Sequence, residues 1–579
     1  MASRIPVIAL VTAVLIVCAG SLIRAREGAG AAIPWITYEA EAMKTNGAVS
    51  GPQFTPFHVE TESSGQRCVK LAAAGEFVEF TAVSDANAMV VRFNLPDSEH
   101  GGGTNSALEL FINGKSVRTL ALSSRYSLIY GDYPFSNDPG KGKPRNFYDE
   151  LRVRNLAVAK GDMIRLQKSA ADTPACIVDL VDLEKIAPPL NQPANALSVL
   201  DFGASGNGET DDTAALIRCI AEAKKQARIC WVPAGDFKIT HDILLPSSVT
   251  IQGAGMWHTT FVGDENLYGH ADRRVRFKLS GRDIRLADFA IVGKLNYRND
   301  DEPNDGVLGA GCADSTVSRI WIEHTKTGVW IYNGTNLTIE GCRFRDLMAD
   351  GVNLCTGTNG TIVQNCSTRG TGDDCFAIWP TVSDQGYVGQ IPQPGKNIIR
   401  HCTGQLPFLA NGGALYGGAG NRIEDCVFSN ITAGCGILIS TTFPTSDEQR
   451  KIDNNFSGTT VVSGCRLIRC GGYDHDWGWR GSFQICLDRR NISGLSISDV
   501  EIEESFSDGL TVVARDGAKG PGTLLSARLD SVRISNFGLG ASGRHGLFIG
   551  KDAAGSMTLV NSKIADVQNN STAFTVVRE

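Results

Sequence analysis

The 579-residue sequence contains no long run of lysine or arginine, and acidic residues outnumber basic ones. Its formal net charge is −7 and its isoelectric point is about 5.8. A protein that binds nucleic acid needs a concentration of cations to meet the phosphates. The composition therefore predicts no nucleic-acid partner.

Long apolar runs are also scarce, and the only candidate extends from Ile5 to Ala19. Arg4 precedes this run, and Ala29-Gly30-Ala31 follows it as a cleavage pattern. This arrangement is typical of a signal peptide. We expect residues 1–31 to be removed, leaving a secreted, extracellular protein that does not contact a membrane; an uncleaved anchor is the alternative.

The sequence lacks an even set of cysteines for pairing, because fifteen of its sixteen cysteines follow the predicted leader. An odd number excludes a fully paired disulfide framework. Several of these cysteines recur at one place in a repeat. They are therefore interpreted as small apolar residues of a core.

Residues 33–187 are predicted to form a β-sandwich. Short runs alternate apolar and polar residues, as in Phe77-Val78-Glu79-Phe80, and Asn113-Gly114 is typical of a hairpin turn. A connector, residues 188–197, contains too many prolines for regular structure.

Residues 198–579 contain an internal repeat of short strands. They open with a Gly-rich turn and one amphipathic helix, for which Asp212 or Thr213 is the expected N-cap. The repeat has no Leu-x-x-Leu-x-Leu frame, which excludes a leucine-rich solenoid. An aliphatic residue followed three positions later by cysteine marks the repeat, with two of the intervals equal to 24 residues, at Ile339/Cys342, Val363/Cys366, Ile399/Cys402, Ile423/Cys426 and Val462/Cys465. This period predicts an all-β fold, a parallel β-helix preceded by the sandwich.

Three carboxylates converge when the 24-residue period is applied. Asp350 then lies over Asp374 of the next coil, about 4.8 Å away as between paired strands, and Asp373 is one residue further along. Like charges this close raise the pKa of at least one carboxyl group. Glycoside hydrolysis needs one protonated acid and one carboxylate. We assign Asp373 as the general acid and expect Asp350 and Asp374 to share the attacking water.

Asp350 has the same strand parity as the inward-facing Val352, so it must lie at a bend to reach the surface. The alternative interpretations are that these aspartates are ordinary turn residues or that they ligate a structural ion.

The segments Asp350-Gly351-Val352-Asn353-Leu354 and Gly372-Asp373-Asp374-Cys375-Phe376 resemble the active-site pattern of polygalacturonases and their right-handed β-helical relatives of the pectate-lyase-like superfamily. The Gly-His-Gly and Arg-Ile-Lys signatures of polygalacturonases are missing. Leu438 and Ser440 stand where the two cations would bind the substrate's carboxylate. A neutral glucan is therefore expected.

The triad together with the preceding sandwich resembles glycoside hydrolase family 87, which comprises α-1,3-glucanases and mycodextranases. The resemblance implies hydrolysis of α-1,3-glucosidic bonds in α-1,3-glucan or nigeran, an inverting mechanism and no catalytic cofactor. A lyase or hydrolase acting on a uronate polymer, and a non-catalytic β-helical adhesin, are the alternatives. We expect a monomer.

Sugar rings stack on aromatic side chains and hydrogen-bond to planar polar groups. An insertion between coils combines both, and neighbouring coils add further candidates; Asp300, Asp305 and Lys396 are weaker ones. The predicted substrate-binding residues are Trp379, His401, Tyr416, Tyr473, Asp474, His475, Asp476, Trp477 and Trp479. His401 directly precedes the core residue Cys402, which favours a structural role for it.

The start and the end of the sandwich resemble carbohydrate-binding modules of the family 6 and 35 type. That resemblance implies a structural calcium ion, a cation that prefers oxygen ligands. Glu39, Glu41 and Asp179 are the candidate ligands. A plain sandwich without an ion is the alternative.

Overall fold

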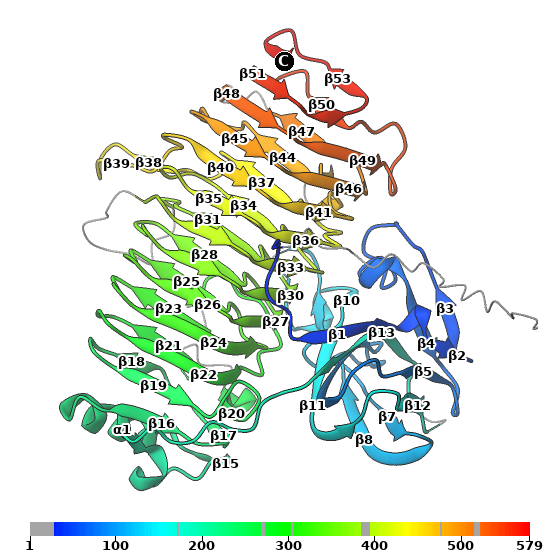
Figure 1. Cartoon of the computed structure of the whole chain (residues 1–579), viewed down its shortest axis with the longest axis vertical. Helices are drawn as coiled ribbons and strands as arrows, with labels where there is room; N and C mark the ends of the chain where they lie inside the picture. Colours follow the sequence, from blue (N-terminus) through cyan, green and yellow to red (C-terminus); the bar gives the residue numbers. More distant parts are fainter. Residues whose placement is uncertain are drawn as a thin grey trace, which may run out of the picture.

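The computed structural model describes residues 28–133, 135–170, 173–267, 273–302, 306–383, 394–474, 478–514 and 522–579. These residues form a β-sandwich that packs against the side of a long stack of parallel β-coils (Figure 1). The predicted all-β fold is confirmed. Within the described ranges, no helix combines the length and the apolar character needed to cross a bilayer.

The sandwich consists of two antiparallel sheets that share one apolar core. Asn113 and Gly114 have φ angles of 51° and 76°, as the hairpin prediction requires. The first sheet contains β1 (Trp35–Glu39), β3 (Ala48–Ser50), β4 (Cys68–Leu71), β6 (Ala86–Asn94), β11 (Asp149–Val158) and β13 (Cys176–Glu184). The second contains β2 (Lys44–Thr45), β5 (Phe77–Thr81), β7 (Asn105–Ile112), β8 (Lys115–Ser123) and β12 (Met163–Lys168).

The β-helix contributes up to three strands from each coil, and the strands of its two long sheets pair in parallel with those of neighbouring coils. One face is a 12-stranded sheet of β18 (Ile243–Leu245), β21 (Arg276–Leu279), β23 (Gly306–Ala310), β25 (Val329–Tyr332), β28 (Val352–Cys355), β31 (Phe376–Trp379), β34 (Gly413–Leu415), β37 (Ile437–Ser440), β44 (Phe483–Cys486), β47 (Leu510–Val513), β50 (Leu547–Ile549) and β53 (Val567–Asn569).

The other two faces form one continuous 25-stranded sheet. Its central coils contain β22 (Arg285–Val292), β24 (Thr316–Glu323), β26 (Thr338–Glu340), β27 (Arg343–Leu347), β29 (Ile362–Gln364), β30 (Ser367–Thr371), β32 (Ile398–Arg400), β33 (Thr403–Gln405), β35 (Arg422–Glu424), β36 (Val427–Ser429), β40 (Thr460–Ser463) and β41 (Arg466–Ile468).

Helix α1 (Thr213–Lys225) lies at the first coil, where it packs against β14 (Ala196–Ser198) and β16 (Ile229–Val232). Asp212 occupies the N-cap position as expected, but its carboxylate does not cap the helix. It accepts hydrogen bonds from the backbone N–H groups of Ser205 and Gly206 instead. Asp211 accepts the hydrogen bond from the Thr213 N–H.

The register predicted from the repeat is confirmed. Val352 pairs with Phe376, and Leu354 pairs with Ile378. All fifteen cysteines of the described residues are buried. The repeating cysteines are 0–1% exposed and belong to the continuous core of the coils. Their role as small apolar core residues is therefore confirmed.

The two domains share both apolar and ionic contacts. Phe147 of the sandwich stacks on Phe408 with ring centroids 4.0 Å apart. Arg343 of β27 lies 2.7 Å from Glu184, and Arg369 of β30 lies 2.7 Å from Asp182. These contacts fix the sandwich beside the central coils.

Residues 28–32, most of which the prediction assigned to the leader, lie along the β-helix. The Gly30 N–H donates to the Asp425 carbonyl at 2.7 Å, and the Ala31 N–H donates to Thr403 at 2.9 Å. Residues 1–27 lie outside the described part of the chain. The predicted cleavage near Ala31 stays a prediction.

Candidate active site

One series of turns in the β-helix holds the three predicted catalytic aspartates. Asp350 lies in the turn between β27 and β28, and Asp373 and Asp374 lie in the equivalent turn between β30 and β31. The Gly351 N–H donates to the Asp374 carbonyl at 3.0 Å, so the register of the strands continues into the turns. The bend that lets Asp350 leave the core is present, because the strand begins only at Val352.

The structure brings the three carboxylates together. Each offers an oxygen atom, and these atoms all lie within 4.8 Å of one another. Asp350 and Asp374 are only 5% and 3% exposed, whereas the Asp373 side chain is 29% exposed. Asp373 is therefore the member of the triad that a substrate oxygen reaches most easily.

Asp374 is held by two residues of the following coil. Its Oδ1 accepts hydrogen bonds from the Asn411 backbone N–H at 3.1 Å and from the Asn411 side chain at 2.7 Å. Its Oδ2 accepts one from the Tyr416 hydroxyl at 2.9 Å. Tyr416 was predicted as a substrate-binding residue, and the structure places it against the triad itself.

Burial and mutual repulsion keep protons in the cluster. Burial, followed by the charge of Asp373, raises the pKa of Asp374 to about 7. Burial and the charges of Asp373 and Asp374 raise the pKa of Asp350 well above its usual range. Burial and repulsion thus favour the protonated forms of Asp350 and Asp374, and a retained proton is one of the requirements of acid–base catalysis.

Arg298 also belongs to this site, although no sequence pattern pointed to it. Its guanidinium donates to Asp373 Oδ2 at 2.7 Å, to Asp300 Oδ1 at 2.9 Å and to the Gly372 carbonyl at 2.6 Å. Although burial disfavours its charge, Asp373 and Asp300 raise the pKa of Arg298, so it stays cationic. Asp300, a weak candidate in the sequence, thus lies one side chain away from the triad.

The sandwich also reaches this site. The Tyr133 ring lies 5.2 Å from the Arg298 guanidinium, and the Tyr133 hydroxyl lies 3.3 Å from both Arg298 and Asp300. No periodicity could have joined residue 133 to residue 373, because they belong to different domains. The sandwich therefore forms part of the wall beside Asp373.

Two family models match this architecture. One describes the α-1,3-glucanase catalytic domain D1 and matches residues 32–186; the other describes catalytic domain D2 and matches residues 210–547. The chain belongs to glycoside hydrolase family 87, the α-1,3-glucanases. The family predicted from the triad and the sandwich is confirmed.

Solved structures of the family 87 type are similar over almost the whole chain. The catalytic domain of Agl-KA has a TM-score of 0.83 at 25% identity and covers 95% of this chain and 99% of its own. The catalytic unit of a thermostable family 87 α-1,3-glucanase from Streptomyces thermodiastaticus has a TM-score of 0.77 at 28% identity, with 95% and 96% covered.

Curated relatives match shorter parts. The pre-neck appendage protein of Bacillus phage B103 is 25% identical over 215 residues, which are 36% of this chain and 24% of the phage protein. A glucan 1,3-beta-glucosidase of Cochliobolus carbonum is 23% identical over 146 residues, 25% of this chain and 18% of that enzyme. The family 87 chain thus spans about a quarter or less of these relatives.

The aromatic insertion of this family 87 chain is a small hairpin of β42 (Tyr473–Asp474) and β43 (Gly478–Trp479). It lies in the turn between β41 and β44, in the same series of turns as the triad. Tyr473 and Trp479 contact each other edge to face, with centroids 5.6 Å apart. Asp474 is 8% exposed and pairs with Arg480 at 2.9 Å. Of the remaining candidates, His475, Asp476 and Trp477 lie outside the described residues.

Trp379 is half-buried at the end of β31 and belongs to an aromatic group on the 12-stranded sheet. Its ring lies 5.8 Å from Trp330 and 5.4 Å from Phe443, and Phe443 lies 5.1 Å from Tyr416. Since Tyr416 contacts Asp374, this group connects Trp379 to the predicted catalytic aspartates. Trp330 was not predicted.

His401 is not brought to the triad. It lies in the turn between β32 and β33, on another edge of the coil, with φ 48° and a hydrogen bond to the Gly28 carbonyl at 3.0 Å. The same turn of the next coil holds Asp425 with φ 50°. His401 therefore has a turn-forming role in this structure. Lys396 is likewise an exposed turn residue, with φ 53°, and Asp305 lies outside the described residues.

The predicted calcium ligands only partly fit a cation. Glu39 and Glu41 each have one buried oxygen without a hydrogen-bond partner within the described chain. Burial and neighbouring carboxylates raise the pKa of Glu39 to about 8, and burial raises that of Glu41 to about 7. Asp179 differs, because its oxygens already accept hydrogen bonds from Arg92 and from the Ser64 N–H. Its charge is met by Arg92.

Proposed function

We propose that the protein hydrolyses α-1,3-glucosidic bonds in α-1,3-glucan or nigeran, as a secreted monomer without a catalytic cofactor. The observation that carries the proposal is the convergence of Asp350, Asp373 and Asp374 within 4.8 Å on one turn series. Among the similar structures, family 87 catalytic domains have been solved with nigerose and with tetrasaccharides bound. Those ligands support an α-glucan substrate here.

The same solved structures carry single Asp→Ala changes at three positions. Two of those positions are adjacent and lie 23 and 24 residues after the first. Asp373 and Asp374 follow Asp350 at the same intervals. This coincidence of spacing supports the assignment of the triad as the catalytic residues.

A neutral sugar suits the charges around the triad. Leu438 and Ser440, at the positions where polygalacturonases carry cations, are 2% and 0% exposed. Arg298 is the cation beside Asp373, and it already pairs with Asp373 and Asp300. Its charge is therefore met within the protein rather than presented to a uronate carboxylate.

We assign Asp373 as the general acid, because it is the most exposed carboxyl group of the triad. Asp350 or Asp374, whose pKa values are raised, would pass to Asp373 the proton that it donates. Asp350 and Asp374, stacked on adjacent coils, would orient and deprotonate the water. Both oxygens of Asp374 accept hydrogen bonds, which fix its direction. A carboxylate held in this way suits a base that positions water, as an inverting mechanism requires.

The closeness of the triad makes the stereochemical outcome a sharp test. Inverting pairs usually lie about 6.5–9.5 Å apart and retaining pairs about 5 Å apart, whereas the 4.8 Å limit here joins the nearest oxygens. Proton NMR during hydrolysis of a nigero-oligosaccharide identifies the first anomer released. The β-anomer supports inversion, and the α-anomer would refute it.

The first experiment is release of reducing sugar from insoluble α-1,3-glucan, nigeran, dextran and polygalacturonate, with Asp374→Asn as the matched variant. Release from either of the first two, lost in the variant, is the expected result. Activity on polygalacturonate alone would overturn the proposed substrate, and equal activity of the variant would overturn the catalytic role of the triad.

The aromatic hairpin can be tested separately. Trp479→Ala should raise the KM for the glucan about 3–10-fold in steady-state kinetics, because one stacking contact with a sugar ring is lost.

A structural calcium ion in the sandwich is proposed with a reduced ligand set. Glu39 and Glu41 would hold it, and Asp179 would stay with Arg92. Addition of calcium to the chelated protein should raise its Tm, and Glu41→Gln should abolish that rise. An equal rise in the variant would exclude this site.

A further inference from the structure

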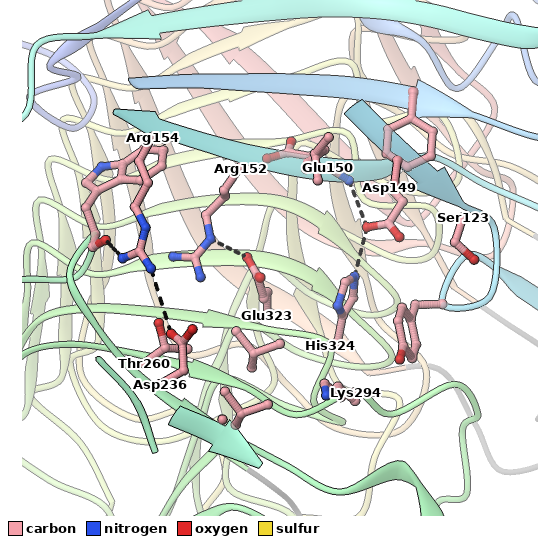
Figure 2. A pocket seen from close by; sticks show the side chains of 18 residues that line it. Ser123, Asp149, Glu150, Arg152, Arg154, Asp236, Thr260, Lys294, Glu323 and His324 are labelled. Atoms are coloured by element: carbon pink, nitrogen blue, oxygen red, sulfur yellow. Dashed lines mark hydrogen bonds and ion pairs between the residues drawn. The ribbon is translucent and has the colours of Figure 1, made fainter. Parts of the chain in front are cut away.

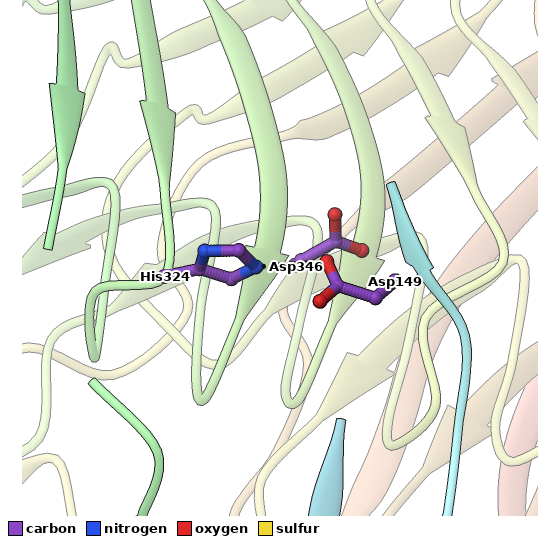
Figure 3. A group of neighbouring side chains, drawn as sticks. All are labelled: Asp149, His324 and Asp346. Carbon is purple, nitrogen blue, oxygen red and sulfur yellow. Dashed lines mark hydrogen bonds and ion pairs between the residues drawn. The ribbon is translucent and has the colours of Figure 1, made fainter. Parts of the chain in front are cut away.

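A second cluster of ionisable residues lies where the sandwich meets the β-helix, away from the catalytic triad. It borders a cavity of about 520 Å³ between the two domains (Figure 2). Tyr126, Asp149 and Arg152 line this cavity from the sandwich, and Lys294, Glu323 and His324 line it from the β-helix. Asp149 and His324 face each other there, and Asp346 lies beside them (Figure 3).

The β-helix builds its part of the cluster from equivalent positions of two coils. His324 follows β24 and Asp346 lies in β27, with left-handed φ angles of 51° and 49°. The His324 N–H donates to the Asp346 carbonyl at 3.2 Å. The next coil has Gly370 at this position, with φ 75°. A Cβ there would lie 2.5 Å from Asp346 Oδ1, so glycine leaves space beside the carboxylate.

The donor atoms of the cluster are close and incompletely satisfied. One atom from each of Asp149, His324 and Asp346 lies within 4.8 Å of the others. His324 Nε2 lies 2.8 Å from Asp149 Oδ1. Asp346 is 2% exposed, yet its Oδ1 has no hydrogen-bond partner among the described residues. A buried acceptor without a donor is costly and calls for an explanation.

We propose that Asp149, His324 and Asp346 bind one divalent cation of the zinc type, which joins the sandwich to the β-helix. One imidazole nitrogen and two carboxylate oxygens are a donor set that zinc accepts, with water completing the tetrahedron. The unpartnered Asp346 oxygen becomes a ligand. The cavity supplies the access route that a metal ion needs.

Small movements suffice to form the site. Ligands about 2.1 Å from a tetrahedral zinc ion lie about 3.4 Å from one another. The 2.8 Å distance between His324 and Asp149 would open by roughly half an ångström. Tyr126 stacks on the His324 ring with centroids 4.6 Å apart, which fixes the plane of the imidazole.

Charged groups of both domains surround the cluster. Glu150 and Glu323 act on Asp346 along with Asp149, and Arg92 is the cation that opposes them. Arg152 acts on His324, but it also pairs with Glu323 at 3.4 Å. Glu150 likewise pairs with Arg345 and Arg369. The charges of both glutamates are therefore met within the protein, and the carboxylates of the cluster itself are the groups that a cation would neutralise.

The test is the metal content of the purified protein after equilibration with zinc and removal of excess ion, measured by mass spectrometry. Wild type should retain about one zinc per chain. His324→Gln and Asp346→Asn should each weaken binding at least about 100-fold, because loss of a ligand exceeds the 10–100-fold cost of losing an outer partner. Repeating the assay with manganese in place of zinc shows whether the same residues bind a harder metal ion instead.

Two control variants separate this site from others. Asp374→Asn should keep its zinc, which excludes binding by the catalytic triad. His545→Gln should also keep it, since His545 pairs with a single carboxylate, Asp566, at 3.0 Å. Loss of zinc in either control, or its retention in His324→Gln, would overturn the proposal.

A second measurement covers the case in which the cluster variants do not fold. Anomalous diffraction at the zinc edge from zinc-soaked wild-type crystals should give a peak between Asp149, His324 and Asp346. If wild type shows no peak and retains neither zinc nor manganese, the metal site is refuted. A proton shared between His324 and Asp149 would then explain their short distance.

Discussion

Two clusters of three ionisable residues lie close together among the described residues, and they are assembled differently. The proposed catalytic triad comes from two consecutive coils of one repeat. The interdomain cluster of Asp149, His324 and Asp346 takes one residue from the sandwich, 175 residues before its partner His324. The first is partly open to substrate, whereas all three residues of the second are buried.

The repeats of a solenoid can therefore bring reactive groups together without a second domain, as in the triad. The buried interdomain cluster needs a residue of the sandwich to complete it. Asp373 gains exposure because it lies beyond the strand, at a turn. Asp149 meets His324 only because the sandwich packs on β24 and β27. We therefore expect the first cluster to control catalysis and the second to control the stability of the interface.

The largest expected effect is at the proposed general acid. Asp373→Asn should lower kcat on α-1,3-glucan about 10²–10⁴-fold, since proton transfer contributes that much. Its rate on α-nigerosyl fluoride should fall far less, because fluoride leaves without protonation. Asp374→Asn, which removes the base, should lose activity on both substrates; the opposite pattern would exchange the roles of the two residues.

Arg298 connects the triad to the sandwich, so its substitution tests whether this contact is needed for catalysis. Arg298→Lys should lower kcat about 10–100-fold, because one ammonium cannot donate in the plane to Asp373, Asp300 and the Gly372 carbonyl together. The matched control is Arg319→Lys, whose guanidinium pairs with Asp288 away from the site. Steady-state kinetics should show no change in the control, and equal losses would mean a general effect on folding.

Chelation tests the second cluster. Removal of the proposed ion should lower the Tm by about 2 °C, because a ligand at 100 times its Kd adds about 2.7 kcal/mol to the free energy of unfolding and a chain of this length unfolds with an entropy of about 1.2 kcal/mol/K. Asp149→Asn should show the lower Tm without the chelator and no further fall with it. If the chelator lowers the Tm of this variant as much as that of wild type, the effect comes from another site, such as the proposed calcium site, and not from this cluster.

Asp350 gives a pH-dependent effect on stability. Its pKa is raised in the folded chain, so folding retains a proton that the unfolded chain releases near pH 4. The associated stabilisation is complete below that pH and is lost as the pH rises through the folded pKa. The Asp350→Asn variant, which carries a neutral side chain, should therefore have a free energy of unfolding about 0.5–2 kcal/mol above that of wild type at pH 8. The difference should vanish near pH 4. Thermal unfolding across this range measures it.

The fold and the triad could be predicted from the sequence because both depend on a local period. The 24-residue interval between repeating cysteines sets the register, and the register alone places Asp350 over Asp374. Asn113-Gly114 likewise determines its hairpin through backbone preference. These signals need no knowledge of distant contacts.

The residues that were missed depend on contacts between distant segments. Arg298 and Tyr133 meet Asp373 through a loop and through the docked sandwich, and neither lies at a repeating position. His401 was selected for its chemistry, but its place on the coil directs it to another edge. Asp179 resembles a calcium ligand in sequence, but Arg92 of β6 occupies it in the folded sandwich.

The most direct test compares one substitution in each cluster, Asp374→Asn and Asp346→Asn, for initial rates on nigerotetraose and bound zinc in the same preparations. We predict that Asp374→Asn loses at least about 10³-fold in kcat and keeps its zinc. Asp346→Asn should lose its zinc and retain kcat within about threefold, as expected for a group outside the reacting atoms. Full activity in Asp374→Asn would contradict the catalytic role of the triad.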